Sequence, residues 1–294
     1  MGTRSAAVRL ALIAAHVVCG PAVGVAVAQD KPPAPAAPPR APAKVTDPKL
    51  LPDPPLSPEA QKKHDEEVKA LVKQLRAEKN KEMVELQIGN LGKAASRAAR
   101  DALIEYCRGN KNQEYLDHAF KALARIGGTT VLEYLTGKEA LRCDDFLTNV
   151  SAATALGESK DARAIPHLIE IVQGKSPKIE VQGACLIALG KCGGTKSKEA
   201  ADAILPFCSA KQDTVRANAL EAYGYTGSKD AVGLLAEHLA TEKNTRCRGA
   251  AATGLGWTKQ RDAIPPLQAA ANGDDAQTVR ECAMNALKEL SALR

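Results

Sequence analysis

An apolar residue followed by a glycine, most often after an alanine, recurs through the chain at nearly constant intervals. Ala155-Leu156-Gly157 and Ala188-Leu189-Gly190 are its clearest copies. Successive motif glycines lie 35, 30, 33, 34 and 32 residues apart. Self-similarity at a period of 20–50 residues is typical of solenoids and other repeat architectures. The motif glycines are Gly92, Gly127, Gly157, Gly190, Gly224 and Gly256.

The segment from Val215 to Gly224 shows what one repeat contains. Its apolar residues at 215, 219, 222 and 223 follow the spacing of a single helical face. We expect Gly224 to end this helix as a C-cap with positive φ. Asp230 then precedes a second apolar helix and is predicted to cap its N-terminus. Each repeat is therefore predicted to be helix, turn, helix, with prolines near the start of the second helix at Pro166, Pro206, Pro265 and Pro266.

The repeat resembles the short HEAT-like repeat of the phycobilisome-lyase type. The resemblance rests on Val-x-x-x-Ala-x-x-Ala-Leu-Gly followed by Asp-x-x-Ala-Ile-Pro-x-Leu, is best at 149–172 and 246–271, and covers roughly 80–294 in six or seven units. It implies an all-α fold, an α-solenoid in which HEAT-like helical hairpins form a right-handed superhelix. It also implies a scaffold or adaptor that binds a protein or peptide partner. If the second helices line the concave side, the candidate contact residues are Arg163, His167, Glu170, Glu237 and His238.

The first 58 residues have a different composition from the repeats. Residues 1–28 are predicted to be a signal peptide, with Arg4 and Arg9 before an apolar stretch and an Ala-x-Ala cleavage site at 26–28. Val18 before Cys19 disfavours a lipoprotein. Residues 29–58 are rich in proline and alanine and are expected to form a disordered linker. The repeat domain is then 59–294, with an N-terminal capping helix and a C-terminal half-repeat, exported to the periplasm or beyond the cell.

Charge and motif content argue against several classes of function. The formal net charge is +6, and removal of the predicted signal leaves 38 basic against 34 acidic residues, spread along the chain. This mild excess does not predict a nucleic-acid binder. The histidines stand apart, with no His-x-x-x-His pair and no His-Glu step, and no phosphate-binding loop is present. We expect no catalytic residue, no metal and no cofactor, and no membrane insertion after signal removal.

Seven cysteines follow Cys19, which is an odd number. None is spaced as Cys-x-x-Cys, so neither a zinc site nor a thioredoxin-like pair is predicted. In an exported protein, Cys192 could bridge Cys208 across one repeat, and Cys107 could bridge Cys143 between repeats. Core packing is the alternative interpretation for Cys185 and Cys282, since buried free cysteine behaves as a small hydrophobe.

Two further features carry open alternatives. Arg216, Arg248 and Arg280 share one position in three repeats, and they either bind an acidic partner or else hydrogen-bond between repeats or lie in solvent. Trp257, the only tryptophan, is expected in the turn after Gly256, either as a contact residue or packed over that turn. For the whole chain, a tetrapyrrole-lyase-like chaperone and a structural cell-envelope component remain alternatives to the adaptor.

Overall fold

The computed structural model describes residues 58–292, apart from residues 79 and 176. All of these residues belong to one unit of the chain, Thr46–Arg294. Within them the secondary structure is helical and contains no strand. The α-helices are α1 Pro58–Ala77, α2 Lys81–Ala94, α3 Arg97–Gly109, α4 Gln113–Ile126, α5 Thr129–Thr136, α6 Phe146–Ser159, α7 Ile165–Val172, α8 Ile179–Gly193, α9 Lys198–Ile204, α10 Asp213–Tyr225, α11 Ala231–Thr241, α12 Thr245–Trp257, α13 Ile264–Gly273 and α14 Gln277–Ser291.

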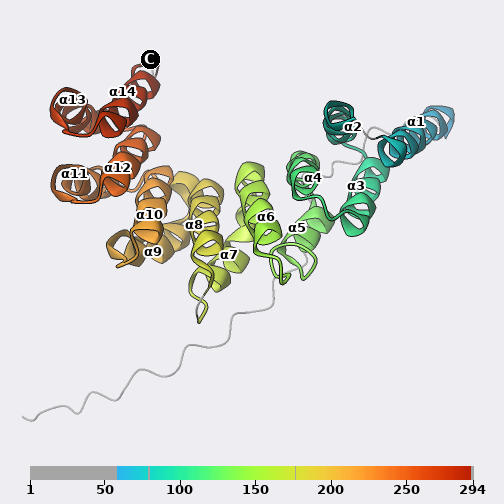
Figure 1. Ribbon diagram of the computed structural model, residues 1–294, viewed down its shortest axis with the longest axis horizontal. Coiled ribbons are helices and arrows are strands. Elements are labelled where there is room, and N and C mark those ends of the chain that lie inside the picture. The colour runs from blue at the N-terminus through green and yellow to red at the C-terminus, as the bar shows by residue number, and fades with distance from the viewer. Residues whose placement is uncertain (1–57, 79, 176, 293–294) are drawn as a thin grey trace, which may run out of the picture. The chain divides into compact units, whose positions relative to one another are not determined.

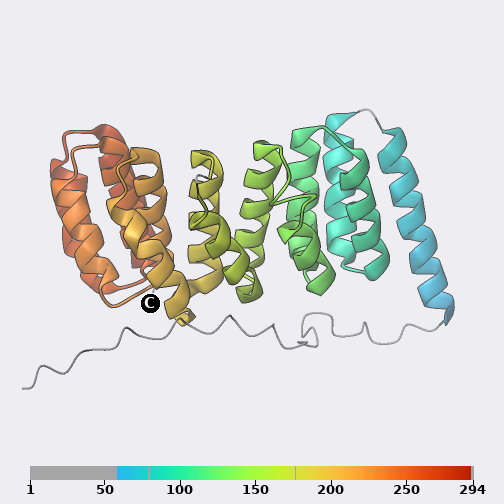
Figure 2. The same ribbon diagram turned by 90° about the horizontal axis from the view of Figure 1, so that it is seen from below.

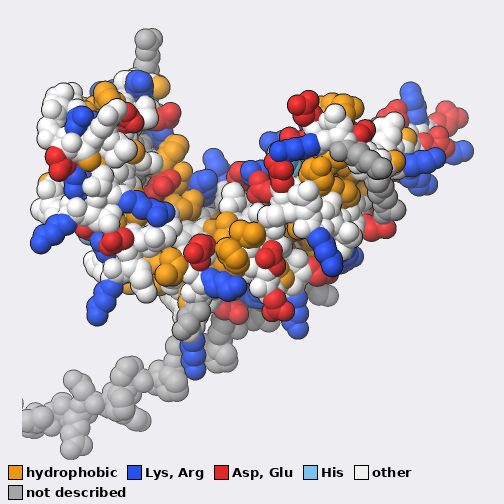
Figure 3. Space-filling model, in the orientation of Figure 1, with side chains coloured by type: hydrophobic (Ala, Val, Ile, Leu, Met, Phe, Trp, Pro, Cys, Tyr) orange, Lys and Arg blue, Asp and Glu red, His pale blue; other side chains and the backbone are white. Residues whose placement is uncertain are grey.

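The helices stack in chain order as antiparallel pairs (Figures 1 and 2). Helices α2, α4, α6, α8, α10, α12 and α14 form one layer in which each packs on the next, and we call them the inner helices. Helices α3, α5, α7, α9, α11 and α13 form the other layer and are called the outer helices. The inner helices border the hollow of this unit, which the space-filling view also shows (Figures 1 and 3). The predicted all-α solenoid is thus confirmed.

Local sequence signals explain where several helices begin. Asp145 is the N-cap of α6, where its carboxylate accepts a hydrogen bond from the Thr148 N–H at 2.9 Å. Asp161 accepts one from the Arg163 N–H at 3.0 Å in the 3₁₀ turn Ala162–Ala164, which leads into α7. Proline lies at the first positions of α7 and α13, as predicted. Asp230 has the predicted N-cap position of α11, but its side chain does not make the expected capping hydrogen bond.

The motif glycines are not helix caps, with the exception of Gly127. Among the described residues, the glycines with positive φ are Gly127, Gly128, Gly194 and Gly227. Gly224 lies inside α10, where a Cβ would come within 2.2 Å of the Gly254 carbonyl oxygen on α12. A Cβ on Gly190 would lie 2.4 Å from the Ala222 oxygen on α10. These positions need glycine because neighbouring inner helices nearly touch there, and the prediction of a positive φ at Gly224 was wrong.

Close backbone contact in one layer also explains the side on which the stack is hollowed. Gly157, Gly190 and Gly256 each face an alanine of the next inner helix, so the inner helices approach one another closely. The outer helices make fewer contacts with one another. The layer with the shorter helix-to-helix spacing lies on the hollow side (Figure 1). The hollow therefore belongs to the first helices of the repeats and not to the second.

The two ends of the array differ from its middle. Helix α1 packs one apolar stripe, including Val68 and Leu75, against α2 and α3, and most of its other described side chains are exposed. Helix α14 repeats an inner helix and has no outer partner after it among the described residues. The assignment of these two helices as a terminal cap and a half-repeat stays a prediction. The predicted signal peptide 1–28 with Cys19, and the linker up to residue 57, lie outside the described residues.

Candidate functional site

The five residues predicted to bind a partner lie on outer helices, away from the hollow. Arg163 precedes α7, and its guanidinium donates to both Asp161 and the Thr129 hydroxyl, at 2.7 and 3.0 Å. Glu170 on α7 forms an ion pair with Arg142 at 2.6 Å. Half-buried His167 lies between them in sequence. Burial, followed by the charge of Arg142, lowers the pKa of His167. This first group is spread along α7, with Arg163 just before its start and Glu170 near its end.

The other two predicted residues belong to α11 and are separated from that group by α9. Glu237 is exposed, and His238 Nδ1 lies 3.9 Å from the Glu242 carboxylate. The structure therefore does not bring the five residues together. The premise that second helices line the concave side is wrong for this chain, because α7 and α11 are outer helices (Figure 1). Sequence cannot easily reveal which helix of an amphipathic pair faces inward, since both bury one stripe against the other.

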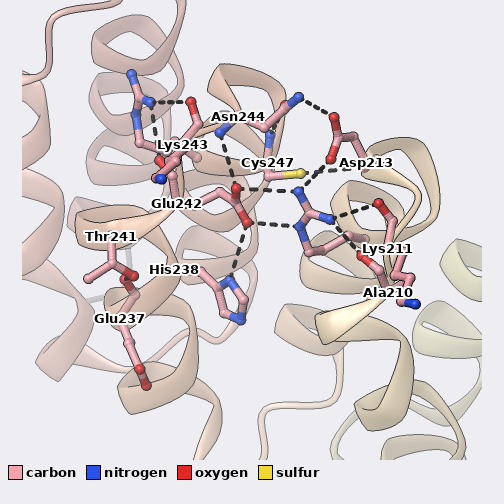
Figure 4. Close-up of polar contacts among 12 residues, drawn as sticks. Ala210, Lys211, Asp213, Glu237, His238, Thr241, Glu242, Lys243, Asn244 and Cys247 are labelled. Carbon is pink, nitrogen blue, oxygen red and sulfur yellow. Dashed lines mark hydrogen bonds and ion pairs between the residues drawn. The ribbon is translucent and has the colours of Figure 1, made fainter.

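The repeated arginines contact the turns between repeats, and Figure 4 shows the polar contacts around Asp213, Glu242 and Asn244. Arg216 donates to the Ala210 carbonyl before its own helix and pairs with Glu242 of the next turn at 2.8 Å. Arg248 does the same one repeat later, with the Glu242 carbonyl at 3.2 Å and the Asp274 carboxylate at 2.9 Å. Arg280 donates to the Asp274 carbonyl at 2.7 Å. The inter-repeat alternative is confirmed, and these guanidiniums are already engaged within the chain.

All seven described cysteines are free thiols, so neither suggested disulfide is formed in the structure. The Cys192 Sγ lies 3.2 Å from the Leu156 carbonyl of the preceding inner helix. The Cys143 Sγ lies 3.3 Å from the Asp145 carbonyl at the start of α6. Cys107 and Cys208 are buried in the core. Cys185 is also fully buried, as the core-packing interpretation predicted, whereas Cys282 is half-buried.

A row of side chains runs along the hollow side at the ends of the inner helices. On α10 the core takes Val215, Ala219 and Tyr223, whereas Glu221 and Tyr225 are only partly buried. That spacing turns the second set away from the outer helices. The same place in each repeat, directly after the motif glycine, is occupied by Glu158, Lys191, Tyr225 and Trp257. We call these four residues the inner row.

An aromatic pair is the most distinctive part of the inner row. Tyr225 and Trp257 stack with ring centroids 4.9 Å apart and planes 19° apart. The Lys191 Nζ lies 5.7 Å from the centroid of the Tyr225 ring. The Lys259 Nζ lies 5.2 Å from the centroid of the Trp257 ring. Trp257 is the last residue of α12 rather than part of the turn, which corrects the sequence-based placement.

Sequence reasoning missed Tyr225 altogether. Its signal was present, because Tyr225 and Trp257 each follow a motif glycine and lie 32 residues apart. Equivalent positions in adjacent repeats lie side by side in a solenoid. Two aromatic side chains at one repeat position in consecutive units could therefore have been read as a stacked pair.

A cavity of about 540 Å³ opens beside the aromatic pair. Three glycines line it, Gly157 at the end of α6, Gly190 in α8 and Gly194 directly after α8, and of these only Gly194 has no atom within 4 Å of an added Cβ. Its lining residues are Gly157, Glu158, Lys160, Gly190, Lys191, Gly194, Thr195, Tyr225, Trp257, Thr258 and Lys259. The volume is within the range of small-ligand sites. A larger cavity of about 710 Å³ is lined by residues of α1 to α4, among them Leu75, Tyr106 and Tyr115.

Glu221 lies on α10, about one helical turn before Tyr225. Burial raises the pKa of Glu221, and the charge of Lys191 and the indole of Trp257 partly oppose that rise. The indole Nε1 is itself buried and lacks a partner within hydrogen-bonding geometry among the described residues.

The stacked helical pairs and their continuous interior define an α-solenoid. Models of HEAT repeats match residues 137–222 and 201–288, which together span just over half of the chain. The chain therefore belongs to the HEAT-repeat family. Its repeats form a helical scaffold whose inner layer carries the aromatic pair.

Solved structures with a related arrangement were also compared. The complex of CpcE and CpcF of phycocyanin lyase from Nostoc sp. PCC7120 aligns with 21% identity and a TM-score of 0.48, over 85% of this chain and 100% of that chain. Human deoxyhypusine hydroxylase in complex with glycerol aligns with 17% identity and a TM-score of 0.37, over 80% and 99%. The search of curated proteins found no match.

Among the described residues, no cluster of three or more histidine, cysteine, aspartate or glutamate side chains could hold a metal ion. None of the helices described is both long and apolar enough to cross a bilayer.

Proposed function

We propose that this HEAT-repeat protein is an exported scaffold or adaptor that binds a protein or peptide partner through the hollow side of its inner helices. It acts without catalysis, cofactor or metal, and it does not bind nucleic acid. Export is supported by the signal-like sequence of residues 1–28 and the proline-rich stretch after it. Partner binding is supported by the inner surface itself.

The observation that carries the proposal is the partly exposed Tyr225–Trp257 stack. Tryptophan and tyrosine are enriched among residues that dominate binding energy at interfaces, because they bury a large area at low entropic cost. Here two such rings form a preformed, rigid surface beside a cavity. The outer-helix candidates provide no comparable surface, since Arg163 and Glu170 are engaged with neighbouring residues.

Affinity capture with the full chain tests this function. The chain is immobilised and exposed to envelope extract, and retained proteins are compared between wild type, Tyr225→Ala and Trp257→Ala. The matched control is Leu205→Ala, which removes an exposed apolar side chain from the 3₁₀ turn Leu205–Ser209 after outer helix α9. We expect a protein retained by wild type and by the control but lost from both aromatic variants. Retention that is equal in all four would contradict the proposal.

A further inference from the structure

The cavity beside the aromatic pair combines an apolar wall with a basic rim. Tyr225 and Trp257 provide the wall, and Lys160, Lys191 and Lys259 lie around the opening. The three lysines lie at or just after the C-terminal ends of α6, α8 and α12, so they reach the cavity from different helices rather than along one. A partner group that fills the cavity therefore passes between ammonium groups on either side.

The positive charge of this rim is only partly balanced within the chain. Lys160 and Lys191 form no ion pair with any described residue. Lys259 lies 3.4 Å from Glu289, but both side chains are exposed, and such pairs contribute little. Glu158 is the one acid in the lining and is exposed, whereas three lysines line the same cavity. The site therefore favours an occupant that brings negative charge of its own.

Stabilisation of helix ends is a simpler role for these lysines. Lysines near the C-terminal ends of helices interact favourably with the helix dipole, and Lys160 and Lys191 lie at such ends. The interaction with the helix dipole does not require the lysine side chain to point in one particular direction. It does not account for the placement of Lys191 and Lys259 over the faces of the two stacked rings, 5.7 and 5.2 Å from the centroids. Cation–π contacts of this kind fix the ammonium groups at the edge of the cavity.

Building on the proposed function, we propose that the partner is a peptide segment with a bulky apolar side chain flanked by acidic residues. The apolar side chain enters the cavity against Tyr225 and Trp257. The flanking carboxylates pair with Lys160, Lys191 and Lys259. Charge complementarity of this type sets specificity and association rate more than total affinity. A single-stranded nucleic acid is the other polyanion that stacks on aromatic rings, and competition by an oligonucleotide distinguishes it from a peptide.

The test is a selection from a displayed library of random 12-residue peptides on the immobilised full chain. We expect the enriched peptides to pair a large apolar residue with acids within two positions of it. Synthetic copies are then titrated against wild type, Trp257→Ala, the double variant K191Q/K259Q and the control Lys138→Gln. Lys138 is an exposed lysine in the turn after α5, outside the cavity.

Affinity is expected to fall roughly tenfold in K191Q/K259Q, about 1.4 kcal/mol for the two lost charge contacts, and to stay unchanged in Lys138→Gln. A 12-residue oligothymidylate is expected not to compete. Circular dichroism checks that each variant folds, and Trp257→Phe, which keeps an aromatic ring, restores binding if the loss in Trp257→Ala reflects lost stacking.

The outcomes separate the two proposals. Peptides that need Trp257 but show no acidic excess, or bind K191Q/K259Q as well as wild type, would overturn the acidic-partner inference and leave the proposed function standing. Competition by the oligothymidylate would overturn it in favour of nucleic acid. Failure to enrich any peptide, or peptides that bind Trp257→Ala unchanged, would count against both.

Discussion

Arg248 donates a bidentate pair of hydrogen bonds to the carboxylate of Asp274, from Nε to Oδ2 at 2.9 Å and from Nη2 to Oδ1 at 3.0 Å. The pair joins α12 to the turn before α14, and both side chains are largely buried, with 12% and 8% of their surface exposed. Because the same guanidinium also holds the Glu242 and Lys243 carbonyls, it connects two successive turns of the array.

Loss of this pair is predicted to destabilise the C-terminal repeats. Arg248→Ala should lower the free energy of unfolding by about 2–3 kcal/mol, the range for charge-assisted hydrogen bonds that leave a partner unsatisfied. Arg248→Lys should recover only part of it, since an ammonium cannot donate in two-pronged geometry. Urea unfolding followed by circular dichroism measures both. An unchanged midpoint in Arg248→Ala would show that the turns are held by packing alone.

The same pair predicts a pH dependence with a definite sign. The hydrogen bond from Arg248 holds the pKa of Asp274 below its ordinary value. A carboxyl with a depressed folded pKa contributes stability above its unfolded pKa, and this is lost as the pH falls through the folded value. Wild type should therefore be more stable than Asp274→Asn at pH 7, and the difference should shrink below about pH 4, near the ordinary aspartate pKa. A difference that grows on acidification would contradict the assignment.

Substitution by alanine should have opposite effects on stability at Gly224 in α10 and at Gly233 in α11. Gly224→Ala places a Cβ 2.2 Å from the Gly254 oxygen, so α10 and α12 must separate. We expect a loss of about 1–3 kcal/mol, the range for overpacking. Gly233 on outer helix α11 has no atom within 4 Å of an added Cβ, and Gly233→Ala should gain up to about 1 kcal/mol in helix propensity. Thermal unfolding of both variants checks this. A stable Gly224→Ala protein would refute the close approach.

Burial of the thiols predicts which cysteines react in the folded protein. Burial raises the pKa of the Cys107, Cys185 and Cys208 thiols to about 12. Because the thiolate is the reactive form, these three should resist iodoacetamide at pH 8 until the protein unfolds. Cys143 and Cys282 are partly exposed and should be alkylated first. Peptide mass mapping after timed alkylation gives the order. Peptides in which Cys192 is joined to Cys208, or Cys107 to Cys143, would show that the oxidised protein differs from the structure.

The repeat architecture could be predicted because its signal is local and recurs. The spacing of Val215, Ala219 and Ala222 places them on one face of a helix, and the constant interval stacks equivalent faces. The features that could not be predicted depend on contacts between two neighbouring helices. Gly224 looks the same in sequence whether it caps a helix or meets Gly254, and only the contact between α10 and α12 distinguishes the two. The layer that faces the hollow follows from those contacts, so the candidate surface was assigned to outer residues such as Glu170 and Glu237.

The proposed function requires a partner to bind at the Tyr225–Trp257 stack. Because the chain contains a single tryptophan, incorporation of 5-fluorotryptophan gives one ¹⁹F signal that reports on this site, even when the partner contains tryptophan. The partner retained in affinity capture is titrated into the labelled full chain. We predict that the signal shifts or broadens and saturates together with the bound fraction measured independently by ultracentrifugation. A partner that binds to saturation while the signal stays unchanged would contradict the account.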